Sequence, residues 1–185
     1  MKNSVKYVAF LRGINVGGHH KVPMAELKKE LQKLELENIV TLLNSGNIIF
    51  DSAGESLSSL EKKVSEHLEK SFGFSIPTII RKSELIYELL SKNPFKDVKL
   101  TKDIRLYVSF LRKNDNTKLK LPWISSDNSY KVIGKSDKTI LSVLDLSISR
   151  TPKAMEALDK NFGKDITTRN WNTIERIGKK LKAGS

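Results

Sequence analysis

Hydrophobic and polar positions follow two different periods in the first 81 residues, and the change of period marks the predicted elements. Residues 5–11 are mostly β-branched, aromatic or aliphatic, which predicts a buried strand. Pro23 suits the first turn of a helix. Apolar residues then recur at the spacing of one helix face, at Met24, Leu27, Leu31 and Leu34. The pattern predicts a strand followed by an amphipathic helix.

A hairpin and a second helix–strand pair follow. Apolar runs at 39–43 and 48–50 flank a polar turn, which predicts a β-hairpin. Ser58 with Glu61 has the spacing of a capping box, and the helix that it opens carries an apolar stripe at Leu60, Val64 and Leu68. We expect this helix to end at Phe72-Gly73 and a strand at 75–80. The order β-α-β-β-α-β is the ferredoxin-like pattern.

The second half predicts a similar order with an added helix at each end. Helices are expected at 83–90, at 151–162 and from the cap Asn170 onward, and one helical turn within 114–121. Strands are expected at 104–110, 130–133, 139–144 and 165–168, with a turn at 134–137. We therefore predict an α+β protein with two ferredoxin-like halves, residues 1–81 and 82–185, and an added C-terminal helix. The shared order indicates a duplicated architecture, although no repeat is visible residue by residue.

The order of the elements places two polar loops at one end of the first sheet. Strand 5–11 runs toward the loop 12–18, its helix returns, and the next strand runs back toward the turn 44–47. The N-terminus of the first helix lies at the same end. Its free N–H groups and positive dipole end favour an anion.

Charge separates the two halves more clearly than composition does. Residues 1–81 hold 11 Lys and Arg against 9 Asp and Glu, a net of +2, and residues 82–185 hold 22 against 12, a net of +10. Such an excess attracts nucleic acid or phosphorylated small molecules, and it could equally form a solvated surface that aids solubility. No apolar run approaches the ~20 residues of a membrane helix, so we expect no membrane partner.

The absence of cysteine excludes disulfides, thiolate zinc sites and thiol catalysis. It also fits a reducing compartment. Residues 1–6 lead directly into the first strand, without the apolar core of a signal peptide. We therefore expect a cytoplasmic protein.

Several motifs resemble those of a known family. They lie at residues 6–15, 16–18, 21–24, 43–47 and 168–173. Together they are similar to the bacterial domain-of-unknown-function family 1697, over nearly the whole chain. The resemblance implies a two-part α+β protein with ferredoxin-like features and implies no reaction.

The first candidate site joins the loop and the turn and contains Arg12, Gly13, Asn15, Gly17, Gly18, Lys21, Asn44, Ser45, Gly46 and Asn47. Arg12 can clamp a phosphate or carboxylate, or tie the loop to backbone carbonyls. The glycines can offer N–H groups to an anion, or serve only the positive φ of a tight loop. The asparagines can read a base or sugar, or close their own turns. Lys21 opposes the helix dipole unless an anion offsets it.

The second candidate site contains Arg169, Asn170, Trp171 and Asn172. Trp171 can stack on a base while Arg169 pairs with a phosphate, but we favour a core position for Trp171 because it shares helical spacing with Ile174. His19 and His20 have no third ligand nearby in sequence, so we predict no metal site and no cofactor.

We expect binding of a phosphate-bearing ligand, either nucleic acid or nucleotide, at the loop end of the first half, with Arg169 nearby. One alternative is an enzyme that acts on a small anionic metabolite in the same cleft. Another is a protein-interaction or homodimerisation module that uses a sheet face. The sequence does not decide whether a reaction is catalysed.

Overall fold

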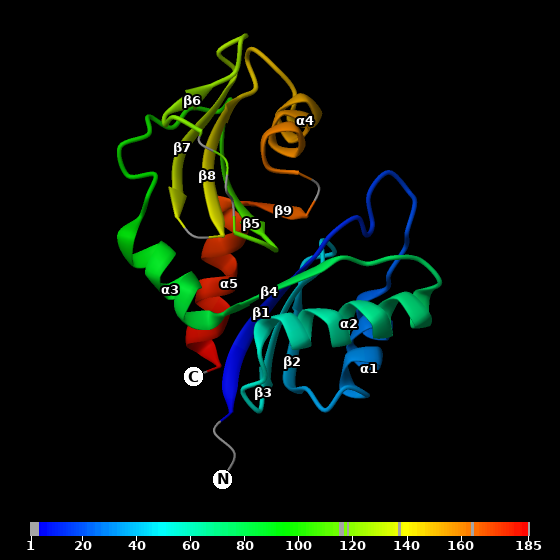
Figure 1. Cartoon of the computed structure of the whole chain (residues 1–185). Coiled ribbons are helices and arrows are strands. Elements are labelled where there is room, and N and C mark those ends of the chain that lie inside the picture. Colours follow the sequence, from blue (N-terminus) through cyan, green and yellow to red (C-terminus); the bar gives the residue numbers. More distant parts are fainter. Residues whose placement is uncertain (1–3, 115–116, 118, 137, 164, 185) are drawn as a thin grey trace. The chain divides into compact units, whose positions relative to one another are not determined.

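The computed structural model describes residues 4–114, 117, 119–136, 138–163 and 165–184 (Figure 1). Residues 1–3, used above in predicting the absence of a signal peptide, lie outside these ranges. The chain divides into two compact units, residues 1–87 with 179–185 and residues 88–178, called unit 1 and unit 2. Helix α3 (Ser83–Lys92) and helix α5 (Trp171–Ala183) carry the chain across the two divisions. The predicted halves, 1–81 and 82–185, instead assign all of α3 and residues 179–185 to the second half.

Unit 1 has the predicted β-α-β-β-α-β order. Its antiparallel sheet has the strand order β2-β3-β1-β4, formed by β1 (Val5–Leu11), β2 (Glu37–Leu42), β3 (Asn47–Ser52) and β4 (Thr78–Lys82). Helices α1 (Met24–Gln32) and α2 (Leu57–Phe72) cover one face of this sheet (Figure 1). The core between them includes Tyr7, Leu27, Leu31, Phe50 and Leu60, in agreement with the predicted apolar stripes.

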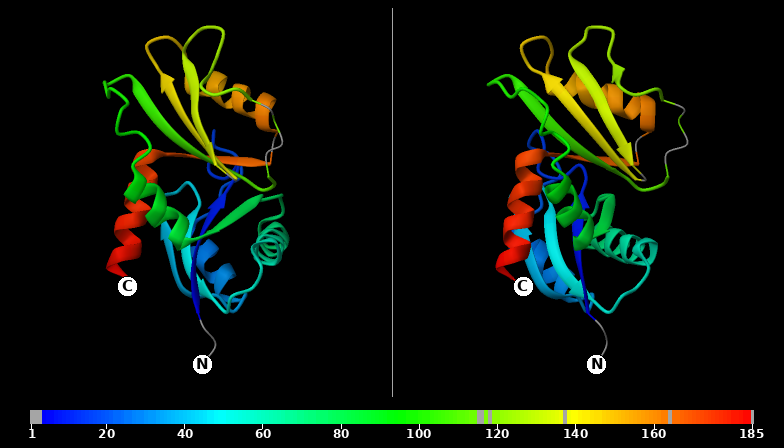
Figure 2. Two further views of the ribbon diagram at one scale, coloured as in Figure 1. Left: turned by 60° about the vertical axis from the view of Figure 1, so that its left-hand side comes forward. Right: turned by 90° about the vertical axis from the view of Figure 1, so that its left-hand side faces the viewer.

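Unit 2 has a five-stranded antiparallel sheet with the order β6-β7-β8-β5-β9. The strands are β5 (Ile104–Leu111), β6 (Trp123–Ile124), β7 (Tyr130–Ser136), β8 (Thr139–Asp145) and β9 (Ile166–Asn170). Helix α4 (Thr151–Phe162) lies along one face (Figure 2). Its Ala154 and Leu158 pack in a core with Tyr107, Tyr130 and Ile140. Both units are thus consistent with ferredoxin-like halves, as predicted.

The two units repeat at the level of single residues, which the sequence analysis missed. Residues 7–12 read Tyr-Val-Ala-Phe-Leu-Arg and residues 107–112 read Tyr-Val-Ser-Phe-Leu-Arg, 100 positions later. The backbone hydrogen bonds match as well, because Arg12 N donates to Pro77 O at 2.9 Å and Arg112 N donates to Asp165 O at 3.0 Å. Without β6, the order of the unit 2 strands is the order of unit 1. The chain therefore carries two copies of one sheet.

The connections in unit 2 differ from the prediction. Residues 114, 117 and 119–121 are not helical, whereas 115, 116 and 118 lie outside the described residues, so no helix matches α1 there. Strand β7 continues through the predicted turn to Ser136, which pairs with Thr139. Gly134 pairs with Leu141 within the strand, and the register shift between Val132 and Gly134 leaves Ile133 as the extra residue of a bulge. Residue 137 of that turn is not described.

The cap of α2 also differs from the predicted capping box. The N-cap is Ser56, whose side chain accepts a hydrogen bond from Ser59 N. Glu61 is instead buried, and its Oε1 accepts a hydrogen bond from Ile80 N at 2.8 Å and lies 3.5 Å from Arg81 Nη1. The capping box predicts that Glu61 binds the N-terminus of α2, but its carboxylate binds the neighbouring strand β4. Among the described helices, none has the length and apolar character that crossing a bilayer requires.

Candidate functional site

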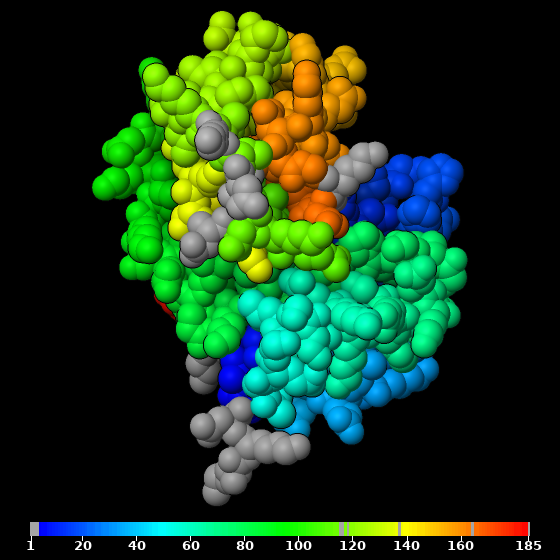
Figure 3. Space-filling model, viewed as in Figure 1, coloured from blue at the N-terminus to red at the C-terminus, as the bar shows by residue number. Residues whose placement is uncertain are grey.

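The loop between β1 and α1 is a small hairpin on the surface of unit 1. Asn15 N donates to His20 O and His19 N donates to Val16 O, both at 3.1 Å. The turn between them is Gly17-Gly18, with φ of 60° and 79°, which is the conformation of a two-residue type I′ turn. The loop stands at the surface in Figure 3, and Val16 at its tip is 69% exposed. The glycines therefore serve the turn and leave their backbone open to solvent.

Asn15 joins this loop to the β2–β3 turn. Its Nδ2 donates to Asn44 O at 2.8 Å and to Val22 O at 3.0 Å, and its Oδ1 accepts from Val22 N at 2.8 Å. The prediction that loop 12–18 and turn 44–47 meet at one end of the sheet is thus confirmed. The amide of Asn15 has a structural task in this arrangement.

The turn itself is tightly packed on the strand beside it. Asn47 is 0% exposed, and its Nδ2 donates to Leu42 O and Ser45 Oγ. Gly46 has a φ of 71°, and a Cβ there would lie 2.7 Å from Leu11 Cβ. Asn47 and Gly46 therefore build the turn.

A cavity of about 400 Å³ opens where the loop meets α1. It is lined by Asn15, Gly18, His19, Lys21, Val22, Pro23, Met24 and Asn44. Pro23 is the N-cap of α1 and supplies no side-chain hydrogen bond to the helix. Of the predicted residues, Arg12, Gly13, Gly17, Ser45, Gly46 and Asn47 do not line it.

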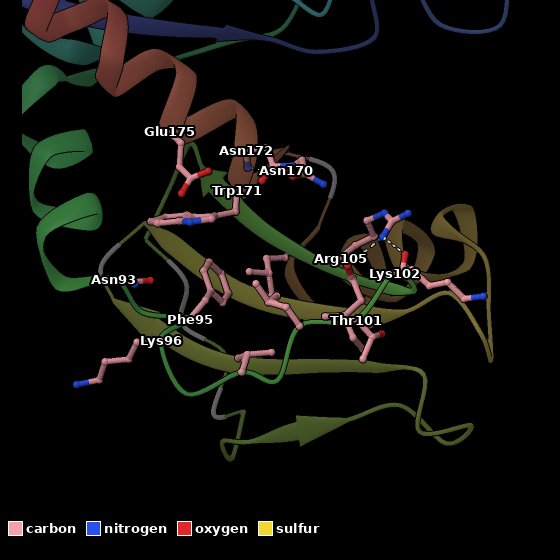
Figure 4. Close-up of a pocket in the computed structure, with 14 residues that line it drawn as sticks. Asn93, Phe95, Lys96, Thr101, Lys102, Arg105, Asn170, Trp171, Asn172 and Glu175 are labelled. Carbon is pink, nitrogen blue, oxygen red and sulfur yellow. Dashed lines mark hydrogen bonds between the residues drawn. The ribbon is translucent and has the colours of Figure 1, made fainter.

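A larger cavity of about 690 Å³ lies in unit 2, and we call it the Trp171 pocket (Figure 4). Ten of its lining residues lie between positions 93 and 106, before and within β5, and the others lie at the end of β9 and in the first turns of α5. Its apolar walls are Phe95, Val98, Leu100, Ile104, Leu106 and Trp171. Its polar residues are Asn93, Lys96, Thr101, Lys102, Arg105, Asn170, Asn172 and Glu175. Three of the four residues of the second predicted site therefore gather in one cavity.

Trp171 is a wall of this pocket and not a free stacking platform. It is only 7% exposed, and its ring meets Phe95 edge to face, with centroids 5.2 Å apart. The preferred core interpretation of Trp171 thus agrees with its burial. Asn170 caps α5, as predicted, since its Oδ1 accepts from Asn172 N at 3.0 Å.

Arg169, the fourth residue of this predicted site, does not line the pocket. It is 8% exposed, and its Nη1 donates to Thr167 Oγ1 at 2.9 Å and to Thr168 O at 2.8 Å. Burial lowers the pKa of Arg169 to about 10. Arg169 therefore supports the β9–α5 junction from inside unit 2.

The cations of the pocket were missed by the sequence analysis. Lys96, Lys102 and Arg105 line it, and Glu175 is the single carboxylate among the lining residues. Arg105 Nη1 donates to Lys102 O at 2.7 Å and to Ile104 O at 3.0 Å, which fixes the guanidinium beside the loop. In Figure 4, Lys102 and Arg105 lie on one side of the pocket, and Trp171 and Glu175 lie on the other. The only signal in the sequence was the basic excess of residues 82–185.

His20 is held by contacts within unit 1. His20 stacks on Phe74, with ring centroids 4.4 Å apart, and its Nδ1 lies 3.2 Å from Gly13 O. Within the described residues, no group of three His, Asp or Glu side chains could hold a metal ion.

Comparisons with known proteins identify a matching family and a similar solved structure, and neither description names an activity. The model of a family described as "Protein of unknown function (DUF1697)" matches residues 5–134. The chain is similar to a solved structure, the conserved bacterial protein SP0830 from Streptococcus pneumoniae, with 27% sequence identity and a TM-score of 0.73. The similarity covers 97% of this chain and 99% of that one. No curated protein matches the sequence.

Proposed function

From the premise that this chain belongs to DUF1697, a family of proteins of unknown function, we propose that it binds a phosphate-bearing small molecule of the nucleotide type in the Trp171 pocket. The class of ligand is the one that the sequence predicts. The location differs from the predicted loop end of unit 1, because the amides of Asn15 and Asn47 are occupied by the loop and turn. Binding at that loop end stays a prediction.

The observation that carries the proposal is the composition of one cavity. About 690 Å³ lies within the size range of small-molecule sites, which combine apolar walls with a few polar groups. Lys96, Lys102 and Arg105 oppose only Glu175, so the lining has a net charge of +2. Such a pocket favours a ligand with an apolar or aromatic body and an anionic group.

The two sides of the pocket suit the two parts of such a ligand. Lys102 and Arg105 can donate charge-assisted hydrogen bonds to phosphoryl oxygens. The walls on the other side, formed by Trp171 and Phe95, can bury an aromatic ring, while the nearby amides of Asn170 and Asn172 offer donors and acceptors to its edge. Because Trp171 is mostly covered, its contribution is a wall contact and not the stacking on an open ring that single-strand binders use.

The test uses Trp171 as a reporter in the full chain. The protein has 2 tryptophans, so Trp123→Phe leaves Trp171 as the only indole. ADP is titrated at 50 and 200 mM salt, with adenosine and pyrophosphate as the two partial ligands. We expect ADP to change Trp171 fluorescence and to raise the melting temperature, with tighter binding than either partial ligand.

Charge variants decide whether the site is the pocket. Loss of one charged hydrogen bond, worth roughly 1.5–3 kcal/mol, predicts at least about tenfold weaker ADP binding in Lys102→Ala. Lys131→Ala removes the same charge from an exposed strand position outside the pocket and should leave binding unchanged. The proposal is wrong if ADP leaves the fluorescence and melting temperature unchanged, or if both variants weaken binding equally.

A further inference from the structure

A second cationic cavity lies within unit 1, away from the candidate sites predicted from the sequence. Its volume is about 450 Å³. Its walls come from β1, β2, β3, the end of α1, and the segment 180–184 at the end of α5. It is lined by Lys6, Lys28, Gln32, Asn38, Ile39, Val40, Ile49, Lys180, Leu181, Ala183 and Gly184. We call it the lysine cavity.

The lining of this cavity contains three ammonium groups and no carboxylate. The groups belong to Lys6, Lys28 and Lys180, and the side chains of Gln32 and Asn38 add two amides. The apolar part of the lining includes Ile39 and Leu181, both buried. Cations from three separate elements therefore converge on one hollow without an acidic residue in its wall.

Asp51 contacts two of the lining residues, and its carboxylate is already occupied by them. Asp51 Oδ1 lies 3.3 Å from Lys6 Nζ, and Asp51 Oδ2 accepts a hydrogen bond from Asn38 Nδ2 at 2.7 Å. Among the described residues, Lys28 and Lys180 form no ion pair, and both are exposed. At most one of the three lysines is therefore neutralised by a protein carboxylate.

The C-terminus of α5 contributes a negative electrostatic field, which is smaller than the positive field of the three lysines. Helix C-termini carry roughly half a negative charge, which favours lysines nearby and disfavours anions. This partial negative charge is favourable for the positive charge of Lys180, which lies in the last turn of α5. It does not offset Lys28, which belongs to α1. The cavity thus keeps a net attraction for negative charge.

We propose that the lysine cavity binds a compact polyanion through phosphoryl oxygens, with two or three linked phosphates as the chemical class. Each ammonium is a point donor that suits a phosphate oxygen without a fixed approach direction. Linked phosphates match several cations at once, whereas a single carboxylate can satisfy only one or two. Because the lining joins residues 6–49 to residues 180–184, the bound anion also holds the end of α5 against the sheet of unit 1.

The experiment measures binding of inorganic tripolyphosphate to the full chain by calorimetry at 50 mM salt. Two lysines of the cavity are replaced, in Lys28→Ala and Lys180→Ala. Each has a matched control beside it on the same helix, Lys29→Ala and Lys179→Ala, with the same loss of charge from an exposed residue outside the cavity. All four positions are exposed, so the variants should fold.

We expect about tenfold weaker binding in each cavity variant and less than twofold change in each control. Amide hydrogen exchange of residues 179–184 should slow when tripolyphosphate is present, and this effect should be lost in Lys28→Ala. Equal weakening in all four variants would show attraction to the overall charge and would overturn the proposal, as would the absence of binding. Lys102→Ala should retain this site, so the result is independent of the Trp171 pocket.

Discussion

Substitution of Glu61 tests how unit 1 is held together. Glu61 lies on α2, faces β4 and is buried together with Arg81. Burial lowers the pKa of Arg81, and the charge of Glu61 opposes that shift. The carboxylate therefore has two tasks, as acceptor for the backbone of Ile80 and as a counter-charge for a buried guanidinium.

The two tasks separate in two variants. Glu61→Ala removes both, and breaking a buried pair by deleting one partner costs about 3–5 kcal/mol of unfolding free energy. Glu61→Gln keeps an amide oxygen for the Ile80 N–H and loses only the charge, so about 1–2 kcal/mol is expected. The difference between the variants measures the hydrogen bond to the backbone and the filled volume.

Urea denaturation of the full chain, followed by circular dichroism, measures both values. Glu66→Gln on the same helix is the control. Glu66 is exposed, with a 3.8 Å pair to Lys62, so its replacement should change stability by less than about 0.5 kcal/mol. If Glu61→Ala costs no more than the Glu66 control, the buried pair is not a main support of unit 1. Adding Arg81→Met to Glu61→Leu should recover part of the loss, because an apolar pair removes the uncompensated charge.

Gly46→Ala should destabilise unit 1 by about 2–4 kcal/mol in the same urea assay, because the new Cβ meets buried side chains and φ is 71°. Gly17→Ala has a comparable φ of 60° but open space around it, so only about 1–2 kcal/mol is expected, and equal losses would contradict the packing argument. Hydrogen bonds from Lys33 and Ser71 lower the pKa of Glu30 from 4.5 to about 2. Its contribution to stability is therefore complete above pH 4.5 and is lost as pH falls toward 2, so melting curves of Glu30→Gln and the unmodified chain should converge in that range.

The sequence predicts the strands of both units better than the details at their ends. Residues 5–11 and 104–110 are recognised because their pattern is local and continuous. The cap of α2 is different, because Ser58 and Glu61 fit a local motif while the partner of Glu61 lies on β4, 19 residues away. The role of the Glu61 carboxylate is set by this long-range contact, which a local sequence motif cannot reveal.

The repeat was missed for a related reason. Five of six residues recur 100 positions apart, and the segments that follow each copy differ in length, so a fixed period does not appear. Matching hydrogen bonds in the two sheets reveal the correspondence at once. The repeat also explains why Arg12 and Arg112 both follow a buried strand.

The candidate sites show the same limit. Asn170, Trp171 and Asn172 were identified from their motif, and they do line the Trp171 pocket. Lys96, Lys102 and Arg105 are scattered among other basic residues, and only folding brings them to the motif. The lysine cavity combines Lys6 with Lys180, which no sequence window can join.

The path of the chain has a consequence for biosynthesis. Leu181 is 1% exposed and belongs to unit 1, although residues 88–178 precede it. Translation proceeds from the N-terminus, and segments begin to fold as they emerge from the ribosome. The first sheet must therefore wait, with this flank uncovered, until all of unit 2 has been synthesised. A nascent chain halted before residue 179 would expose that flank to chaperones, and release of the next few residues would close it.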